Sequence, residues 1–363
     1  MRGRNFRRVG RALSDFFAAA QQRTHLLPAK ISAIKLSMTS RLIPDRFVLM
    51  LLGAMAFGWL LPASGQVLEG VRSISNVSIF LLFFLHGLRL PRAEVVKAAR
   101  SWKLQGAMLA FSFVAMPLAA LVVAKSVGVL FPAALITGLL YCAMLPSTVQ
   151  SAISYSSMAG GNVAASVVAA AVSNLAGIVL TPLLVAFLIG AASGTSLGSG
   201  TVLRIATLLL LPFAMGQLAQ GLLGAWALRQ KALMSFFDRL VIVIAVYVAF
   251  AGAVASGSLS FITPANFALL LGAVAFLLLF AFGAAAALGD ALKLERADRI
   301  TLLFAGAHKS IATGAPMAAI LFGSNAGLIL LPTIVYHIAQ LLVSAPLAAR
   351  LRNRSTLQTV CPD

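Results

Sequence analysis

The chain has 363 residues, of which 60% are apolar and 10% are charged, and its formal net charge is +19. Soluble domains are about half apolar and a quarter charged, so this composition excludes an ordinary soluble protein and indicates a polytopic membrane protein. The excess of Lys and Arg does not indicate nucleic-acid binding, because 24 of the 28 fall on one side of the predicted membrane topology.

The first 45 residues are basic, poor in acids and lack an apolar run of signal-peptide length. We predict that 1–45 is a basic cytoplasmic extension that either lies on the inner membrane surface, where it can contact anionic lipid headgroups, or is disordered. An organelle transit peptide and a translation start at Met38 stay open as alternatives.

Apolar runs of about 20 residues, the length that crosses a ~30 Å hydrocarbon core, then follow almost continuously. We predict an all-α polytopic fold in which each run is one transmembrane helix. The ten predicted spans are 46–62, 74–89, 103–124, 129–158, 163–190, 203–224, 239–257, 266–288, 300–322 and 327–349.

A Gly/Ser-rich linker at 191–202 separates a five-helix repeat at 46–190 from a second at 203–349, and a tail at 350–363 follows. Because five is an odd number, the two halves enter the membrane from opposite sides, which predicts inverted repeats. The distribution of Lys and Arg places both termini in the cytoplasm. We expect a multi-pass protein of the bacterial inner membrane.

Two spans contain polar residues and helix breakers that do not suit a simple lipid-facing helix. They are the fourth, with AMLPSTVQSAISYSSMAGGN at 143–162, and the ninth, with AGAHKSIATGAPMAAILFGSN at 305–325. Broken backbone at membrane depth is tolerated only inside protein or beside a watery cavity, and paired broken helices indicate a transporter's central site. We therefore predict broken, crossing helices 4 and 9. The predicted substrate-binding residues are Lys309, His308, Ser310, Thr313, Pro146, Ser147, Thr148 and Gln150.

Lys309 lies about 15 Å along a helix from Arg299, close to the membrane midplane. None of the nine acids falls inside a span. The buried charge of Lys309 must therefore be stabilised by carbonyls and hydroxyls, removed by loss of the proton, or neutralised by an anion from outside. The third remedy is a substrate. The alternative is that Lys309 caps backbone carbonyls and only stabilises the fold.

Small polar residues in the fourth and fifth spans can offer oxygens to a coupling cation, although helix packing explains them as well. These residues are Ser151, Ser154, Ser166, Ser173 and Asn174. No HExxH motif, intramembrane acid pair or P-loop is present, so we expect no catalytic residue, no resident metal and no cofactor. His337 and Gln340, three residues apart on one helix face, predict a hydrogen bond between helices first and a site second.

The segments LPSTVQSAISYSSMAGGNVAASVVAAAVSNLAG, FFLHGLRLPR and HKSIATGAPMA resemble the bile acid:sodium symporter family, most closely its sodium/bile acid cotransporter 7-like branch. The resemblance covers about residues 41–350. It implies ten spans in two inverted repeats, a panel domain that moves against a core domain, and broken helices that cross.

In sodium-coupled members of that family, an acidic residue in the ninth span and a Ser-Asn pair in the fourth hold sodium. The corresponding positions here fall near Phe304 and near Ser151-Ala152, and the Gln position that follows the acid falls near His308. Ser166 matches one fifth-span hydroxyl, whereas a threonine position is Ala170. These departures weigh against sodium coupling.

We therefore predict a secondary transporter of small organic anions that works by alternating access, with Lys309 as a fixed positive charge in place of sodium. Its partners are the anion and the lipid bilayer, with no nucleic acid. The coupling ion stays open: transport is driven by sodium, by a proton taken up by Lys309 or His308, or by no ion at all. The alternative function is a membrane-embedded regulatory or assembly protein that keeps the fold without flux.

Overall fold

The computed structural model describes residues 46–89, 102–189 and 206–360. The chain divides into two units, residues 1–50 and 51–363, and every contact given below lies within the second. The predicted extension at 1–45 and the predicted linker at 191–202 lie outside the described residues.

The described residues are nearly all helical. Those of the first half form α2 (Arg46–Leu60), α3 (Gly65–Arg89), α5 (Trp102–Ala110), the π-helical turn η1 (Phe111–Ala115), α6 (Met116–Val127), the 3-10 turn η2 (Gly128–Leu130), α7 (Ala133–Met144), α8 (Gln150–Met158), α9 (Val163–Leu184) and the π-helical turn η3 (Val185–Ile189). Those of the second half form the π-helical turn η4 (Ala206–Leu210), α12 (Leu211–Arg229), α13 (Lys231–Ala255), the 3-10 turn η5 (Ser258–Phe261), α14 (Pro264–Ala291), α15 (Arg296–Ala307), α16 (Ile311–Phe322), the 3-10 turn η6 (Gly323–Asn325) and α17 (Ala326–Val360).

Seven helical stretches in the described residues are long and apolar enough to cross a membrane. The last, Arg296–Asn353, has 58 residues, while the apolar helices α2 and α7 are too short to qualify. The protein is therefore a helical, multi-pass membrane protein. Helix boundaries differ from the predicted spans mainly at three helices. Helix α3 begins nine residues before the predicted residue 74, α13 begins eight residues before the predicted residue 239, and α17 continues to Val360 in the predicted tail.

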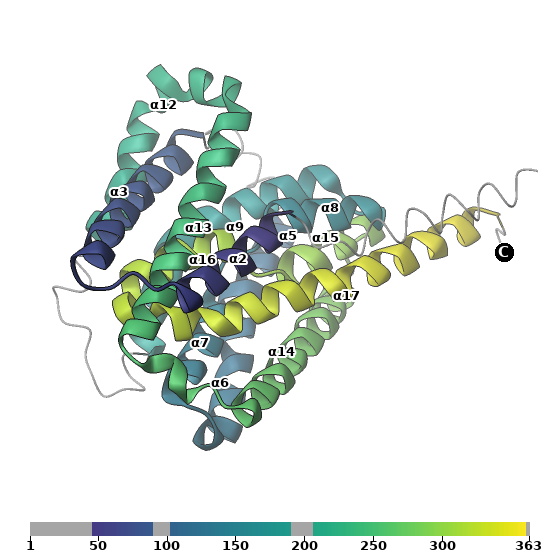
Figure 1. Ribbon diagram of the computed structural model, residues 1–363. Coiled ribbons are helices and arrows are strands. Elements are labelled where there is room, and N and C mark those ends of the chain that lie inside the picture. The colour runs from purple at the N-terminus through teal and green to yellow at the C-terminus, as the bar shows by residue number, and fades with distance from the viewer. Residues whose placement is uncertain (1–45, 90–101, 190–205, 361–363) are drawn as a thin grey trace, which may run out of the picture. The chain divides into compact units, whose positions relative to one another are not determined.

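Helices α3 and α12 lie side by side (Figure 1) and approach closely where glycines face backbone. A Cβ atom added at Gly87 would lie 2.2 Å from the carbonyl oxygen of Phe213, and one at Gly216 would lie 2.0 Å from that of Phe84. Only a residue without a side chain fits either position. Small residues of this kind let membrane helices pack backbone against backbone.

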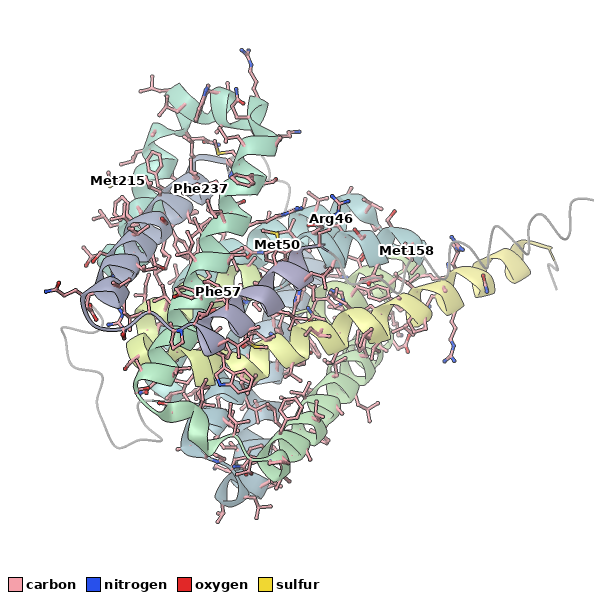
Figure 2. The ribbon with its side chains drawn as sticks, viewed as in Figure 1. Arg46, Met50, Phe57, Met158, Met215 and Phe237 are labelled. Atoms are coloured by element: carbon pink, nitrogen blue, oxygen red, sulfur yellow. The ribbon has the colours of Figure 1, made fainter. Side chains whose placement is uncertain are left out.

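The long helix α17, drawn in yellow, runs beside α7 and α14 (Figure 1). Gly138 of α7 allows the close contact between α7 and α17, because a Cβ atom added there would lie 2.4 Å from the carbonyl oxygen of Ile329. Apolar side chains stand outward from other helices, among them Met215 of α12 (Figure 2). On the same helix Leu218 and Leu222 are 81% and 88% exposed, as expected for a surface in contact with lipid.

Candidate functional site

Two helices are interrupted in the middle, and the interruptions meet. The first separates α7 from α8 at residues 145–149, and the second separates α15 from α16 at residues 308–310. The backbone N–H of Ser310 donates to the carbonyl oxygen of Pro146 at 2.9 Å. Both interruptions fall in the spans for which the sequence predicts broken helices.

Local sequence explains where each helix stops. Leu145 precedes a proline and is extended, with φ −73° and ψ 150°, as steric contact with the proline ring favours. At the second interruption Ser310 is the N-cap of α16, and its hydroxyl accepts from the N–H of Thr313 at 3.2 Å. Pro316, by contrast, lies inside α16 and does not end it.

Lys309 lies in the second interruption and its side chain is 0% exposed. Its ammonium donates to the carbonyl oxygen of Leu145 at 2.9 Å and to that of Ser112, in η1, at 3.0 Å. Within the described residues no carboxylate lies within ion-pair distance of this ammonium. The ammonium is therefore solvated by backbone carbonyls from two other membrane segments.

The peptide of Lys309 is held by Gln340 of α17. The Lys309 N–H donates to Gln340 Oε1 at 2.8 Å, and Gln340 Nε2 donates to the Lys309 carbonyl oxygen at 3.1 Å. This amide therefore replaces the helical hydrogen bonds that the extended backbone lacks. Gln340 Nε2 also lies 2.8 Å from His337 Nδ1, so that nitrogen is an acceptor. The bonds of Gln340 to Lys309 confirm the predicted hydrogen bond between membrane segments.

His308, also 0% exposed, points away from Lys309 because the backbone between them is extended. Its Nε2 lies 2.7 Å from the Ser344 hydroxyl, and its Nδ1 lies 3.0 Å from that of Ser151 and 3.3 Å from that of Thr148. Every partner is a hydroxyl, which can donate or accept. These contacts therefore suit the neutral ring and the imidazolium equally.

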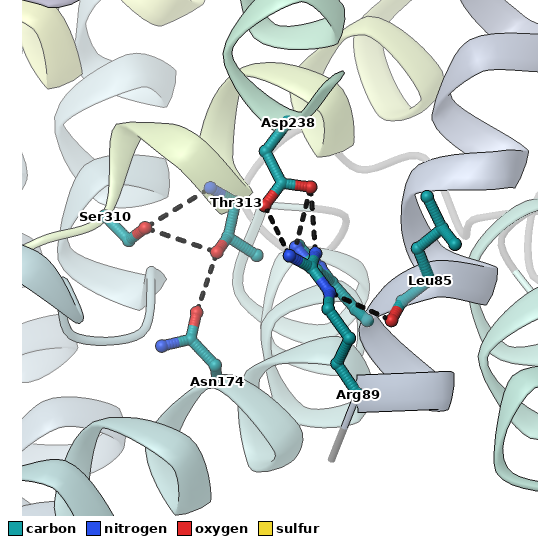
Figure 3. A network of polar contacts seen from close by, with 7 residues as sticks. Leu85, Arg89, Asn174, Asp238, Ser310 and Thr313 are labelled. Atoms are coloured by element: carbon teal, nitrogen blue, oxygen red, sulfur yellow. Dashed lines mark hydrogen bonds and ion pairs between the residues drawn. The ribbon is translucent and has the colours of Figure 1, made fainter. Parts of the chain in front are cut away.

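A second polar cluster joins α9 to both interruptions, and Figure 3 shows its part at Asn174, Thr313 and Ser310. The Thr313 hydroxyl donates to Asn174 Oδ1 at 2.8 Å, and Asn174 Nδ2 donates to the Ser147 carbonyl oxygen at 2.9 Å. Ser173 accepts from the Ser147 N–H at 3.0 Å. The cluster pairs donors with acceptors and fixes α9 against the two breaks.

The exposed side of α8 carries polar residues. Gln150, Ser154 and Ser157 are exposed and spaced i, i+4 and i+7, so they share one helix face. Polar side chains within a membrane protein usually face the bundle interior or a water-filled cavity. This face begins directly after the first interruption.

The sequence model of the SBF-like CPA transporter family matches residues 45–353. The chain belongs to this family. Its relatives include PA2026 of Pseudomonas aeruginosa, 37% identical over 315 residues that cover 86% of the chain and 95% of the relative. "Putative symporter YfeH" of Escherichia coli is 36% identical, covering 86% and 94%. Sodium/bile acid cotransporter 7 of Xenopus tropicalis is 27% identical, covering 80% and 85%.

Membership confirms the resemblance predicted from the sequence and makes the protein a membrane transporter of the bile acid:sodium symporter type. The predicted substrate residues mostly gather around the two breaks, with Lys309 and Ser310 bonded to the first interruption and Thr148 to His308. Gln150 lies on the exposed face instead.

The residues predicted for a cation in this SBF-like transporter are not joined into one group. Ser173 and Asn174 belong to the α9 cluster, and Ser151 contacts His308. The Ser166 hydroxyl lies 3.4 Å from the Ser156 hydroxyl, and Ser154 is exposed on α8. The ring of Phe304 packs edge-on against His308 with centroids 6.0 Å apart.

Sequence reasoning missed Ser112 and Ser344 as residues of this site. Ser344 follows His337 and Gln340 at helical spacing, so a polar stripe on the tenth span could have indicated it. Ser112 gives no such signal, because a π-helical turn in an apolar span cannot be read from residue types. The bidentate ion pair of Arg89 with Asp238, at 2.9 and 2.8 Å (Figure 3), was also missed.

Proposed function

We propose that the protein is a secondary transporter of organic anions that works by alternating access, with its substrate region where the two interrupted helices meet. The observation that carries the proposal is the buried ammonium of Lys309, bonded to carbonyls and unaccompanied by a carboxylate among the described residues. A fixed cation in a low-dielectric site attracts an anion strongly and repels a second cation.

We propose ten crossings for this chain. A 58-residue stretch of about 87 Å is far longer than one ~30 Å crossing, so Arg296–Asn353 supplies two. Helix α2 supplies one more, and α7 with α8 supply another as an interrupted crossing. The two interrupted crossings are then the fourth and the ninth, which supports two inverted five-helix repeats.

With an even number of crossings, both termini lie on the same side, and the excess of Lys and Arg places that side in the cytoplasm. We propose the bacterial inner membrane as the location. The basic extension at 1–45 then lies beside the anionic leaflet.

Lys309 takes, in this proposal, the electrostatic role that a sodium ion would have at the carbonyl of Leu145. Two observations support it: the ammonium bonds that carbonyl directly, and the contacts of the predicted cation residues fall into separate groups. The family resemblance, which places the acidic position near Phe304, agrees with it. Coupling to protons is compatible with the contacts of His308, since its hydroxyl partners accept either protonation state.

Uptake into proteoliposomes tests the proposal. Labelled taurocholate, pyruvate and estrone sulfate represent a bile acid, a 2-oxo acid and a sulfated steroid, and each is offered under an inward sodium gradient, an inward proton gradient and no gradient. We expect saturable uptake of at least one anion above that of protein-free liposomes. Absence of uptake for all three under every gradient would contradict the proposed function.

A further inference from the structure

One buried hydroxyl beside Lys309 has no partner. Ser112 is 0% exposed and its Oγ makes no hydrogen bond in the described part of the chain, although its carbonyl oxygen accepts from Lys309 at 3.0 Å. An unsatisfied buried polar group costs free energy and is rare in native structures, so each one calls for an explanation. A ligand that the hydroxyl binds is one such explanation.

The ammonium of Lys309 also has one N–H that meets no acceptor among the described residues. It carries three N–H groups, of which two donate to the carbonyls of Leu145 and Ser112. Among the described residues, no other acceptor lies within hydrogen-bond distance of it. Two carbonyl dipoles solvate the charge but do not neutralise it, and an uncompensated charge is costly inside a membrane.

Both groups are held rigidly. Ser112 lies in the π-helical turn η1, a distortion that occurs often at functional sites. The Lys309 peptide is fixed on both sides by the Gln340 amide. Donors that are already oriented lose little entropy when a ligand binds, which favours a specific site.

We propose that the Ser112 hydroxyl and the third N–H of Lys309 together bind one small, singly charged anionic group. The group is either the carboxylate of the transported substrate or a small inorganic anion such as chloride. The substrate alternative rests on the function proposed above, whereas the anion site itself does not. Both groups are buried here, so the anion enters when the interrupted helices separate, and its charge then neutralises the ammonium.

Thermal unfolding of the full-length protein in lipid nanodiscs tests the site without a known substrate. Choline acetate, choline chloride or choline gluconate is titrated at constant ionic strength, so that sodium is absent and the bulky gluconate serves as reference. A ligand that binds only the folded state raises Tm with its concentration. We expect a saturable rise of about 2 °C at tenfold excess over Kd.

Two serine variants decide whether the hydroxyl takes part. Ser112→Ala removes it, and Ser75→Ala removes another buried hydroxyl that also lacks a partner in the described residues but lies on α3. We expect Ser112→Ala to keep its Tm in gluconate and to lose the response to acetate, while Ser75→Ala responds as the wild type does. Lys309→Met should abolish the response, and the serine pair remains decisive if this variant does not fold.

The outcomes separate the sources of the anion and the two proposals. A response to acetate alone supports the substrate carboxylate, and a response to acetate and chloride supports a general small-anion site. No response in the wild type, or an equal response in Ser112→Ala, overturns the inference. If the site fails this test but proteoliposomes take up an anion, the proposed function still holds. If Tm responds to the anion but no uptake occurs, the anion site holds without the proposed function.

Discussion

Replacing Gln340 with methionine should destabilise the protein, because its amide holds the Lys309 peptide. Methionine has a similar volume, so the change removes hydrogen bonds and leaves little cavity. The variant loses the bonds of 2.8 and 3.1 Å to the Lys309 N–H and carbonyl oxygen, both inside the protein. Each unsatisfied buried group costs about 1–3 kcal/mol, and polar contacts in membrane bundles fall in the lower part of that range.

We therefore expect a loss of about 2–4 kcal/mol, which corresponds to roughly 3–5 °C in Tm for a chain of this size. Differential scanning fluorimetry in matched nanodiscs measures it. Gln150→Met is the control, since Gln150 is exposed on α8 and makes no contact of this kind. If the two variants melt within 1–2 °C of each other, a spread that surface substitutions rarely exceed, the clamp does not support the interruption and the reasoning fails.

Three further predictions concern other parts of the chain. Asn162→Ala should lower Tm more than Thr263→Ala. Both substitutions remove an N-cap worth about 1 kcal/mol, but the Asn162 side chain also donates to Asp298 at 2.9 Å. Equal losses in a thermal scan would show that the contact with Asp298 contributes nothing. Gly87→Ala should prevent normal packing of α3 on α12. Gly70→Ala should be neutral or stabilising, because nothing lies within 4 Å of the added Cβ. The two variants are compared by size-exclusion chromatography and by Tm. Replacing choline chloride by sodium chloride at equal ionic strength should give no saturable rise in Tm, because the predicted cation residues lie in separate groups; a sodium-specific rise would restore sodium coupling.

The sequence identified the two interrupted helices because their causes are local. Pro146 forces the preceding residue out of the helical region, and Ser310 is a strong N-cap. The isolated charge of Lys309 could likewise be recognised, since residue counting alone places it at depth. Membership in the transporter family follows from the same segments.

The remaining features depend on contacts between distant segments. The acceptor role of Ser112 needs a π-helical turn that composition does not encode, and it joins residues 197 positions apart. The pairing of Arg89 with Asp238 depends on how α3 packs against α13. Oxygen-bearing side chains in small-residue spans are typical both of a cation site and of helix packing, and only tertiary structure reveals the separate contacts that each of them makes.

The most direct test of the central claim compares anion uptake by wild-type and Lys309→Met proteoliposomes, normalised to the amount of folded protein in each preparation. The probe is whichever of taurocholate, pyruvate and estrone sulfate the wild type transports. If Lys309 supplies the positive charge that binds the anion, loss of at least one strong charge-assisted contact, about 1.5–3 kcal/mol, lowers uptake at subsaturating substrate at least tenfold. Unchanged uptake by folded Lys309→Met protein would contradict the account and leave Lys309 as a structural cap on the carbonyls of Leu145 and Ser112.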